Sequence, residues 1–88
     1  MHLVHGRDAG RAATFLIDAP AALAAKLEVF DAQGRRIATP FAGTLASGRT
    51  PVRWGLEQRA GMRVASGVYF ARLTFAGGSR AVQLVVTR

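Results

Sequence analysis

The stretch that decides the fold is VYFARLTF, residues 68–75. One face of an extended chain over this stretch would carry the apolar set Tyr69, Ala71, Leu73 and Phe75. The opposite face would carry Val68, Phe70, Arg72 and Thr74. Alternation of this kind predicts a β-strand with one buried face. The pair Gly77-Gly78 that follows is a hairpin signal. We therefore expect residues 80–87 to return as a second strand, with Val82, Leu84 and Val86 pointing inward.

Shorter segments with the same period of two lie upstream. Residues 13–19 place Phe15 and Ile17 on one face, and Pro20 ends the run. Residues 26–31 direct Leu27 and Val29 inward, and they direct Lys26, Glu28 and Phe30 outward. The sequence DAQG, residues 31–34, has Asp and Gly at the first and fourth positions that a type I turn prefers. Residues 35–39 then return with Ile37 inward.

The middle of the chain adds two extended pieces and several connections. Residues 50–54 place Val52 and Trp54 inside and Arg53 outside, and residues 62–65 form a shorter piece after a loop. We expect connections at residues 21–25 and around Pro40 and Gly43. About seven short strands separated by turns predict an all-β, immunoglobulin/fibronectin-III-like antiparallel β-sandwich.

Length and patterning indicate one domain. A chain of 88 residues falls within the range of a single small domain. Residues 1–12 lack the alternation and are predicted to be a flexible leader before a domain at 13–88. Their first ten residues have no apolar core of a signal peptide, so export would need a signal on a longer parent chain. The sequence contains no stretch of about 20 apolar residues, so we expect no membrane-spanning helix.

Charge and residue types narrow the function classes. Twelve basic residues against five acidic ones give a formal charge of +7, but the arginines are scattered and no RNA-binding aromatic motif accompanies them. We therefore expect no nucleic-acid partner. The chain has no cysteine, its two histidines lie in the predicted leader, and its carboxylates are dispersed. These features predict a protein that is not an enzyme and that uses no metal and no cofactor.

Three stretches taken together resemble a known family. They are LEVFDAQGRRI (27–37), SGRTPVRW (47–54) and GMRVASGVYFARL (61–73). Their order and spacing are similar to the Ig-like domain of the flagellar hook-capping protein and to the C-terminal sorting domains of type IX secretion cargo. The motif positions are Asp31, Gly34, Arg35, Trp54, Gly61, Gly67 and Tyr69. All of them have structural roles, in turns, in the core and at the start of a strand.

This chain departs from the family pattern after Trp54. Family members continue with Asp-Gly-x-Asp or Asp-Gly-x-Asn and a later Gly, whereas the chain has GLEQRAG at residues 55–61. The same length is kept, but both acidic positions are lost. A turn stabilisation or cation affinity that those acids supply in relatives is not expected here.

The resemblance implies a non-catalytic module of an exported or cell-surface bacterial protein. Its partners would be the secretion or surface-attachment machinery, or a neighbouring domain of the parent protein. A structural hook-cap-like or spacer domain is the alternative, and carbohydrate or polyanion binding is a further one. We expect Phe30 and Phe70 on the outer faces, where they cover a thin sandwich or pack on a neighbouring domain. The functional alternative is a protein-docking surface that consists of Phe30, Arg53, Phe70 and Arg72. The oligomeric state stays open, because an exposed edge strand could pair across a dimer.

Overall fold

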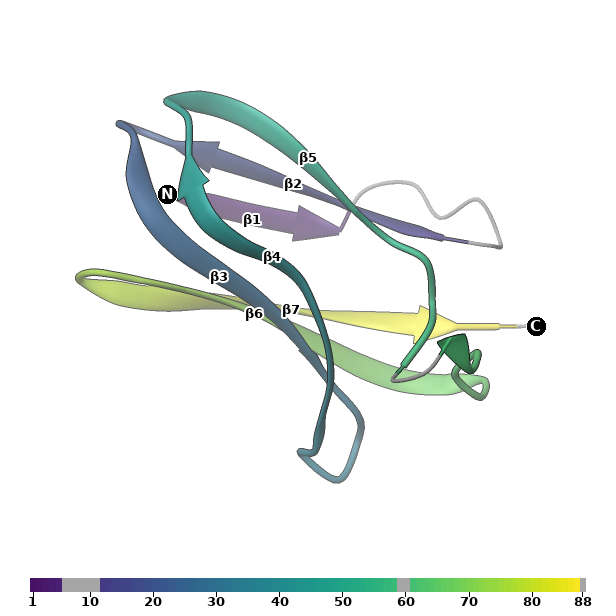
Figure 1. Ribbon diagram of the computed structural model, residues 1–88. Helices are drawn as coiled ribbons and strands as arrows, with labels where there is room; N and C mark the ends of the chain where they lie inside the picture. The colour runs from purple at the N-terminus through teal and green to yellow at the C-terminus, as the bar shows by residue number, and fades with distance from the viewer. Residues whose placement is uncertain (6–11, 59–60, 88) are drawn as a thin grey trace.

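The described residues form two antiparallel β-sheets and no α-helix. The computed structural model describes residues 1–5, 12–58 and 61–87. One sheet has the order β1-β2-β5, with β1 at His2–His5, β2 at Ala13–Ala19 and β5 at Gly48–Trp54. The other sheet has the order β4-β3-β6-β7, with β3 at Leu23–Phe30, β4 at Arg36–Leu45, β6 at Gly67–Phe75 and β7 at Gly78–Val86. The sheets pack face to face, so the predicted all-β sandwich is confirmed (Figure 1).

This strand order follows immunoglobulin topology closely. The sheet β1-β2-β5 corresponds to strands A, B and E, and β3-β6-β7 corresponds to C, F and G. The fourth strand differs, because β4 pairs with β3 instead of with β5. Both edges of the sandwich are therefore closed loosely, by contact of β1 with β7 and of β4 with β5.

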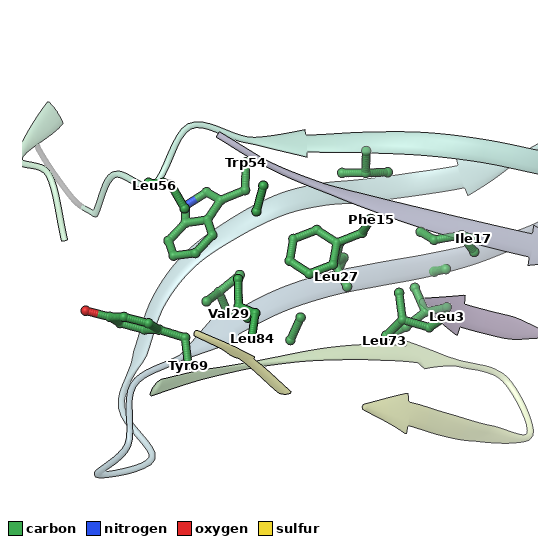
Figure 2. Packing of buried hydrophobic residues seen from close by; sticks show 14 of the residues in the cluster. Leu3, Phe15, Ile17, Leu27, Val29, Trp54, Leu56, Tyr69, Leu73 and Leu84 are labelled. Carbon is green, nitrogen blue, oxygen red and sulfur yellow. The ribbon is translucent and has the colours of Figure 1, made fainter. Parts of the chain in front are cut away.

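The core lies between the sheets and is formed by the alternating side chains that the sequence predicted. Phe15, Ile17, Leu27, Val29 and Leu73 are fully buried (Figure 2). Leu84 and Val86 of β7 are also buried, and Val82 packs against the same cluster. Burial of a large apolar side chain contributes about 1.5–3 kcal/mol, so this two-sided cluster is the main source of stability.

The β6–β7 hairpin has the register expected from a two-residue turn. Phe75 pairs with Gly78, and the pairing continues without interruption to Gly67 opposite Val86. Ala76 and Gly77 form the turn, with Gly77 at a positive φ of 101°. The hairpin signal is confirmed, with its turn one residue earlier than the Gly77-Gly78 pair.

The structure differs from the sequence expectations at the start of the chain. His2–His5, which we placed in a flexible leader, forms β1 and pairs antiparallel with β2, from His2 opposite Asp18 to His5 opposite Phe15. Leu3 is buried in the core. A strand of four residues with one inward side chain is too short to show alternation, and the partner strand fixes its register. The rest of the predicted leader, residues 6–11, lies outside the described residues.

Three internal boundaries also differ. Strand β3 begins at Leu23, inside the predicted connection 21–25, and Ala25 extends its buried face. Strand β4 continues through Pro40 and Gly43 to Leu45, with register shifts against β3. Proline is tolerated there because β4 is an edge strand whose outer N–H groups need no partner. The predicted extended piece at 62–65 contributes only an isolated bridge between Glu57 and Arg63.

Candidate functional site

Asp31 organises the turn between β3 and β4. Its Oδ1 accepts the backbone N–H groups of Arg35 at 2.9 Å and of Gln33 at 3.0 Å, and its Oδ2 accepts Arg35 Nε at 2.9 Å. Gly34 donates its N–H to the Asp31 carbonyl and has a φ of 87°, which favours glycine. The Arg35 backbone N–H above all, with the Arg35 guanidinium and the Gln33 N–H, lowers the pKa of Asp31. Asp31, Gly34 and Arg35 therefore form one self-contained turn, as the predicted turn requires.

Trp54 and Tyr69 meet at one end of the core. Their rings pack edge to face with centroids 6.0 Å apart (Figure 2). Trp54 Nε1 donates to the Glu57 carbonyl at 2.9 Å, and the Tyr69 hydroxyl donates to the Ala65 carbonyl at 2.6 Å. A tyrosine near the start of strand F that bonds to the backbone just upstream is the tyrosine corner of immunoglobulin-like sandwiches. Both motif aromatics are structural.

The loop between β5 and β6 is anchored to the core by the buried side chain of Leu56. Leu56 is buried and has a left-handed φ of 58°, while Gly61 is exposed with a φ of 74°. Two backbone bonds close the loop, from Gln58 N–H to the Met62 carbonyl and from Val64 N–H to the Leu56 carbonyl. The cost of the left-handed leucine, about 1–2 kcal/mol, is offset by burial of its side chain.

Two of the three motif stretches, 27–37 and 61–73, line a shallow hollow at this end of the sandwich. It has a volume of about 380 Å³, and its lining includes Asp31, Arg35, Gly67 and Tyr69. Gly67 begins β6 beside Tyr69. The motif residues hold the loops of one end together, and their polar groups are largely engaged with one another.

The predicted interaction residues separate into two places. Phe30 of β3 and Phe70 of β6 are direct cross-strand partners on the outer face of the four-stranded sheet. The Arg72 guanidinium lies 4.9 Å from the centre of the Phe30 ring, a cation–π contact. Arg53 is exposed on β5 opposite Thr14, on the outer face of the other sheet, so it cannot share this surface. Alternation along a strand shows which residues share a face, but it does not show to which of the two sheets the strand belongs.

The remaining three residues form what we call the aromatic–arginine patch: Phe30, Phe70 and Arg72. Phe70 is 39% exposed, and Phe30 is half-buried. Beside the patch lies an open hollow of about 460 Å³, which reaches from the Asp31 turn to Ala81 on β7. Protein surfaces expose few contiguous large apolar groups. The two phenylalanines of this patch therefore provide unusual apolar contact area, next to the positive charge of Arg72.

Glu28, expected to be outward and exposed, is outward but buried. Its carboxylate accepts Arg36 Nη1 at 3.1 Å and lies 4.0 Å from Lys26 Nζ. Glu28 also stands directly opposite Arg72 in the β3–β6 register. The long basic side chains around it cover the carboxylate. The hairpin turn brings Glu28 and Arg36 together, a pairing that the spacing around Asp31 and Gly34 could have suggested.

The other ion pair joins the strands of the three-stranded sheet. Arg49 Nε donates to Asp18 Oδ1 at 3.0 Å, and this bond above all lowers the pKa of Asp18. His2, which the sequence places in the predicted leader, is exposed and lies opposite Asp18 on the other side of β2. Among the described residues, the arginines with no acidic partner are Arg53, Arg63, Arg72 and Arg80.

Two other kinds of site are missing from the described ranges. Over residues 1–5, 12–58 and 61–87, no three His, Cys, Asp or Glu side chains gather in a way that could hold a metal ion. The same part of the chain contains no helix with the length and apolar character needed to cross a bilayer. Comparison of the chain with family models, with curated proteins and with solved structures found no match.

Proposed function

We propose that this domain is a non-catalytic recognition module of an exported bacterial protein. In this role the aromatic–arginine patch is bound by the secretion or surface-attachment machinery. The observation that carries the proposal is the Phe30–Phe70 cross-strand pair on the outer face of the four-stranded sheet, with Arg72 over the Phe30 ring. Aromatic residues and arginine are the residue types enriched where proteins bind one another.

The chemistry of the patch suits a protein partner. Phe70 is accessible, and Arg72 has no acidic partner among the described residues, so a ligand carboxylate could reach it. The adjoining hollow of about 460 Å³ is open enough for a side chain from a partner. A guanidinium already ordered over an aromatic ring loses less side-chain entropy when it binds an anion.

The export part of the proposal comes from the family resemblance. One local feature supports that resemblance: Leu56 stands where the family pattern has glycine, and it adopts a left-handed φ of 58°. Glycine is the usual residue at such a conformation. A left-handed residue at this position is compatible with the glycine of the family pattern, and this compatibility supports the resemblance.

The proposal is tested by export of a fluorescent reporter that carries a cleavable signal peptide and the whole 88-residue chain. The whole chain is needed because His2–His5 supplies a strand. In a host with a type IX apparatus, the reporter should reach the surface or medium. Phe70→Ser and Arg72→Ser should reduce export, because both side chains belong to the patch.

Arg53→Ser is the matched control. It also removes an exposed arginine from a strand, but on the outer face of the other sheet. Export should be unaffected by Arg53→Ser. Equal losses with Arg53→Ser and Arg72→Ser would show that only net charge matters, and the patch would be rejected. An intact, folded fusion that stays in the periplasm would reject the sorting role and favour a spacer or hook-cap-like module.

A further inference from the structure

Apolar side chains gather on one outer face of the sandwich. Five large apolar side chains are exposed among the described residues, and three of them lie on the outer face of the four-stranded sheet: Val68 and Phe70 of β6 and Val85 of β7. Val68 and Val85 are direct cross-strand partners. Phe70 pairs in the same way with Phe30 on β3. We call these four residues and Arg72 the sheet-face surface, which enlarges the aromatic–arginine patch across three neighbouring strands.

The backbone beneath this surface has no free edge. Strand β6 pairs with both β3 and β7, and β3 pairs with both β4 and β6, so the backbone groups of both strands are directed at neighbouring strands. The outer side of β7 is not open either, because β1 contacts β7 there. The valine and phenylalanine side chains above the backbone have no polar group. A segment that docks on this surface must therefore satisfy its own backbone N–H and C=O groups, which an α-helix does and an extended segment does not.

The spacing of the surface matches one side of a helix. Val68, Phe70 and Arg72 occupy every second position of β6, so successive side chains on this face are about 6.6 Å apart. A helix advances about 6 Å in four residues. A helix that lies along β6 would therefore place two apolar side chains, four positions apart, over Val68 and Phe70, and a residue one turn further would reach Arg72. The open hollow that Phe30 and Phe70 line has room for one of these apolar side chains.

Charge determines the residue expected next to Arg72. Arg72 stands opposite Glu28 in the register, but the Glu28 carboxylate is bonded to Arg36. The same carboxylate lies 4.0 Å from Lys26 Nζ. The Arg72 guanidinium lies over the Phe30 ring instead, and it has no acidic partner among the described residues. These three cations and one carboxylate give the face an excess of positive charge, which favours an acidic residue in the partner.

A second copy of this chain is a poorer occupant than a different protein. Residues 1–5, 12–58 and 61–87 of such a copy contain no α-helix that could lie on the surface. Two copies packed face to face would also bring two positively charged surfaces together, and this repulsion opposes association.

We propose that the sheet-face surface is the docking site for an amphipathic α-helix of a partner protein. The helix would carry two large apolar side chains four positions apart and an acidic side chain one turn beyond them. The apolar pair would cover the valines and phenylalanines, and the carboxylate would bind Arg72, which is already ordered over the Phe30 ring. This inference rests on the proposed recognition role and deepens it, because it specifies the conformation and the charge of the partner.

The test uses the full chain and a capped, alanine-rich peptide of about 18 residues, a length at which such peptides form a helix in water. Its two leucines stand four positions apart, and a glutamate stands one turn beyond them at each end, so one glutamate can reach Arg72 in either orientation. Matched peptides replace both glutamates by lysine, both leucines by alanine, or one alanine between the leucines by proline. We expect the leucine–glutamate helix to bind at least about tenfold more tightly than each of these, and added salt to weaken it.

Two valines on opposite faces of the sandwich provide a matched pair of variants. Val85→Ser removes an apolar group from the sheet-face surface, and Val4→Ser removes one from the outer face of the other sheet. The two side chains are similarly exposed, at 54% and 46%, so both variants should remain folded by far-UV circular dichroism. Val85→Ser should weaken peptide binding about five- to tenfold, whereas Val4→Ser should bind as the native chain does. Arg72→Ser should remove the preference for glutamate over lysine.

Nuclear magnetic resonance of the native chain gives a measurement that needs no variant. Addition of the leucine–glutamate peptide should shift the amide signals of Val68, Phe70, Arg72 and Val85. The amide signal of Val4 should stay unchanged, because it lies on the opposite sheet. Shifts that spread equally over both sheets would overturn the inference.

Several other results would also overturn it. They are failure of the leucine–glutamate peptide to bind, equally tight binding of the lysine or the proline peptide, and equal losses in Val4→Ser and Val85→Ser. A peptide-free dimer that Val85→Ser dissociates would make a second copy the occupant. Loss of export in Arg72→Ser without peptide binding by the native chain would reject the helix site alone. Peptide binding with all the expected preferences, but without export of the reporter, would reject the sorting role alone.

Discussion

Replacement of Trp54 by alanine tests the packing of the core where the motif stretches converge. Trp54 is 4% exposed, packs edge to face on Tyr69, and donates its indole N–H to the Glu57 carbonyl. A tryptophan side chain buries about 200 Å², which at about 25 cal/mol per Å² corresponds to about 5 kcal/mol. The alanine methyl retains about 1 kcal/mol of this.

We therefore expect Trp54→Ala to lower the free energy of unfolding by about 3–5 kcal/mol, the usual cost of emptying a large aromatic site. Small domains have about 5–15 kcal/mol in total, so the variant should be close to unfolding. Urea unfolding followed by far-UV circular dichroism measures the change without using tryptophan fluorescence. Trp54→Phe is the matched control, since it keeps a ring against Tyr69 and loses the hydrogen bond.

Trp54→Phe should cost clearly less, about 1–2 kcal/mol, because Glu57 is exposed and water can solvate its freed carbonyl. A loss below about 1 kcal/mol for Trp54→Ala would show that the indole is not part of a packed core. Equal losses for the two variants would mean that the hydrogen bond, and not the ring, is the important contact. Either result would refute the reasoning.

Two further predictions concern the turn between β3 and β4. Gly34→Ala should destabilise the domain by about 1 kcal/mol in urea unfolding, because the φ of 87° is unfavourable for alanine although space is open; no change would contradict the turn geometry. The folded pKa of Asp31 is lowered from 3.8, so its contribution to stability is complete above that pH and is lost as the pH falls through the folded value. Asp31→Asn should therefore flatten the acid limb of a stability–pH profile, and an unchanged limb would show that the carboxylate is not held by Arg35 and Gln33.

The sequence alone determined which residues face the core. Alternation in residues 68–75 identified Tyr69 and Leu73 as inward, and all four inward positions predicted for residues 13–31 are buried: Phe15, Ile17, Leu27 and Val29. The Asp31–Gly34 turn was also identified, because its hydrogen bonds are local and depend on residues only a few positions apart.

The tertiary structure decided which strands are neighbours. Alternation specifies two faces of a strand but carries no information about its partner, so Arg53 was grouped with a patch that lies on the other sheet. For the same reason β1 was missed: His2–His5 is too short to show a pattern and becomes a strand through pairing with β2. Burial of Glu28 likewise depends on basic side chains brought over it by neighbouring strands. The position of β7 at the edge of its sheet is likewise decided by the sheet order, because an edge strand is one that pairs with a single neighbour among the described strands.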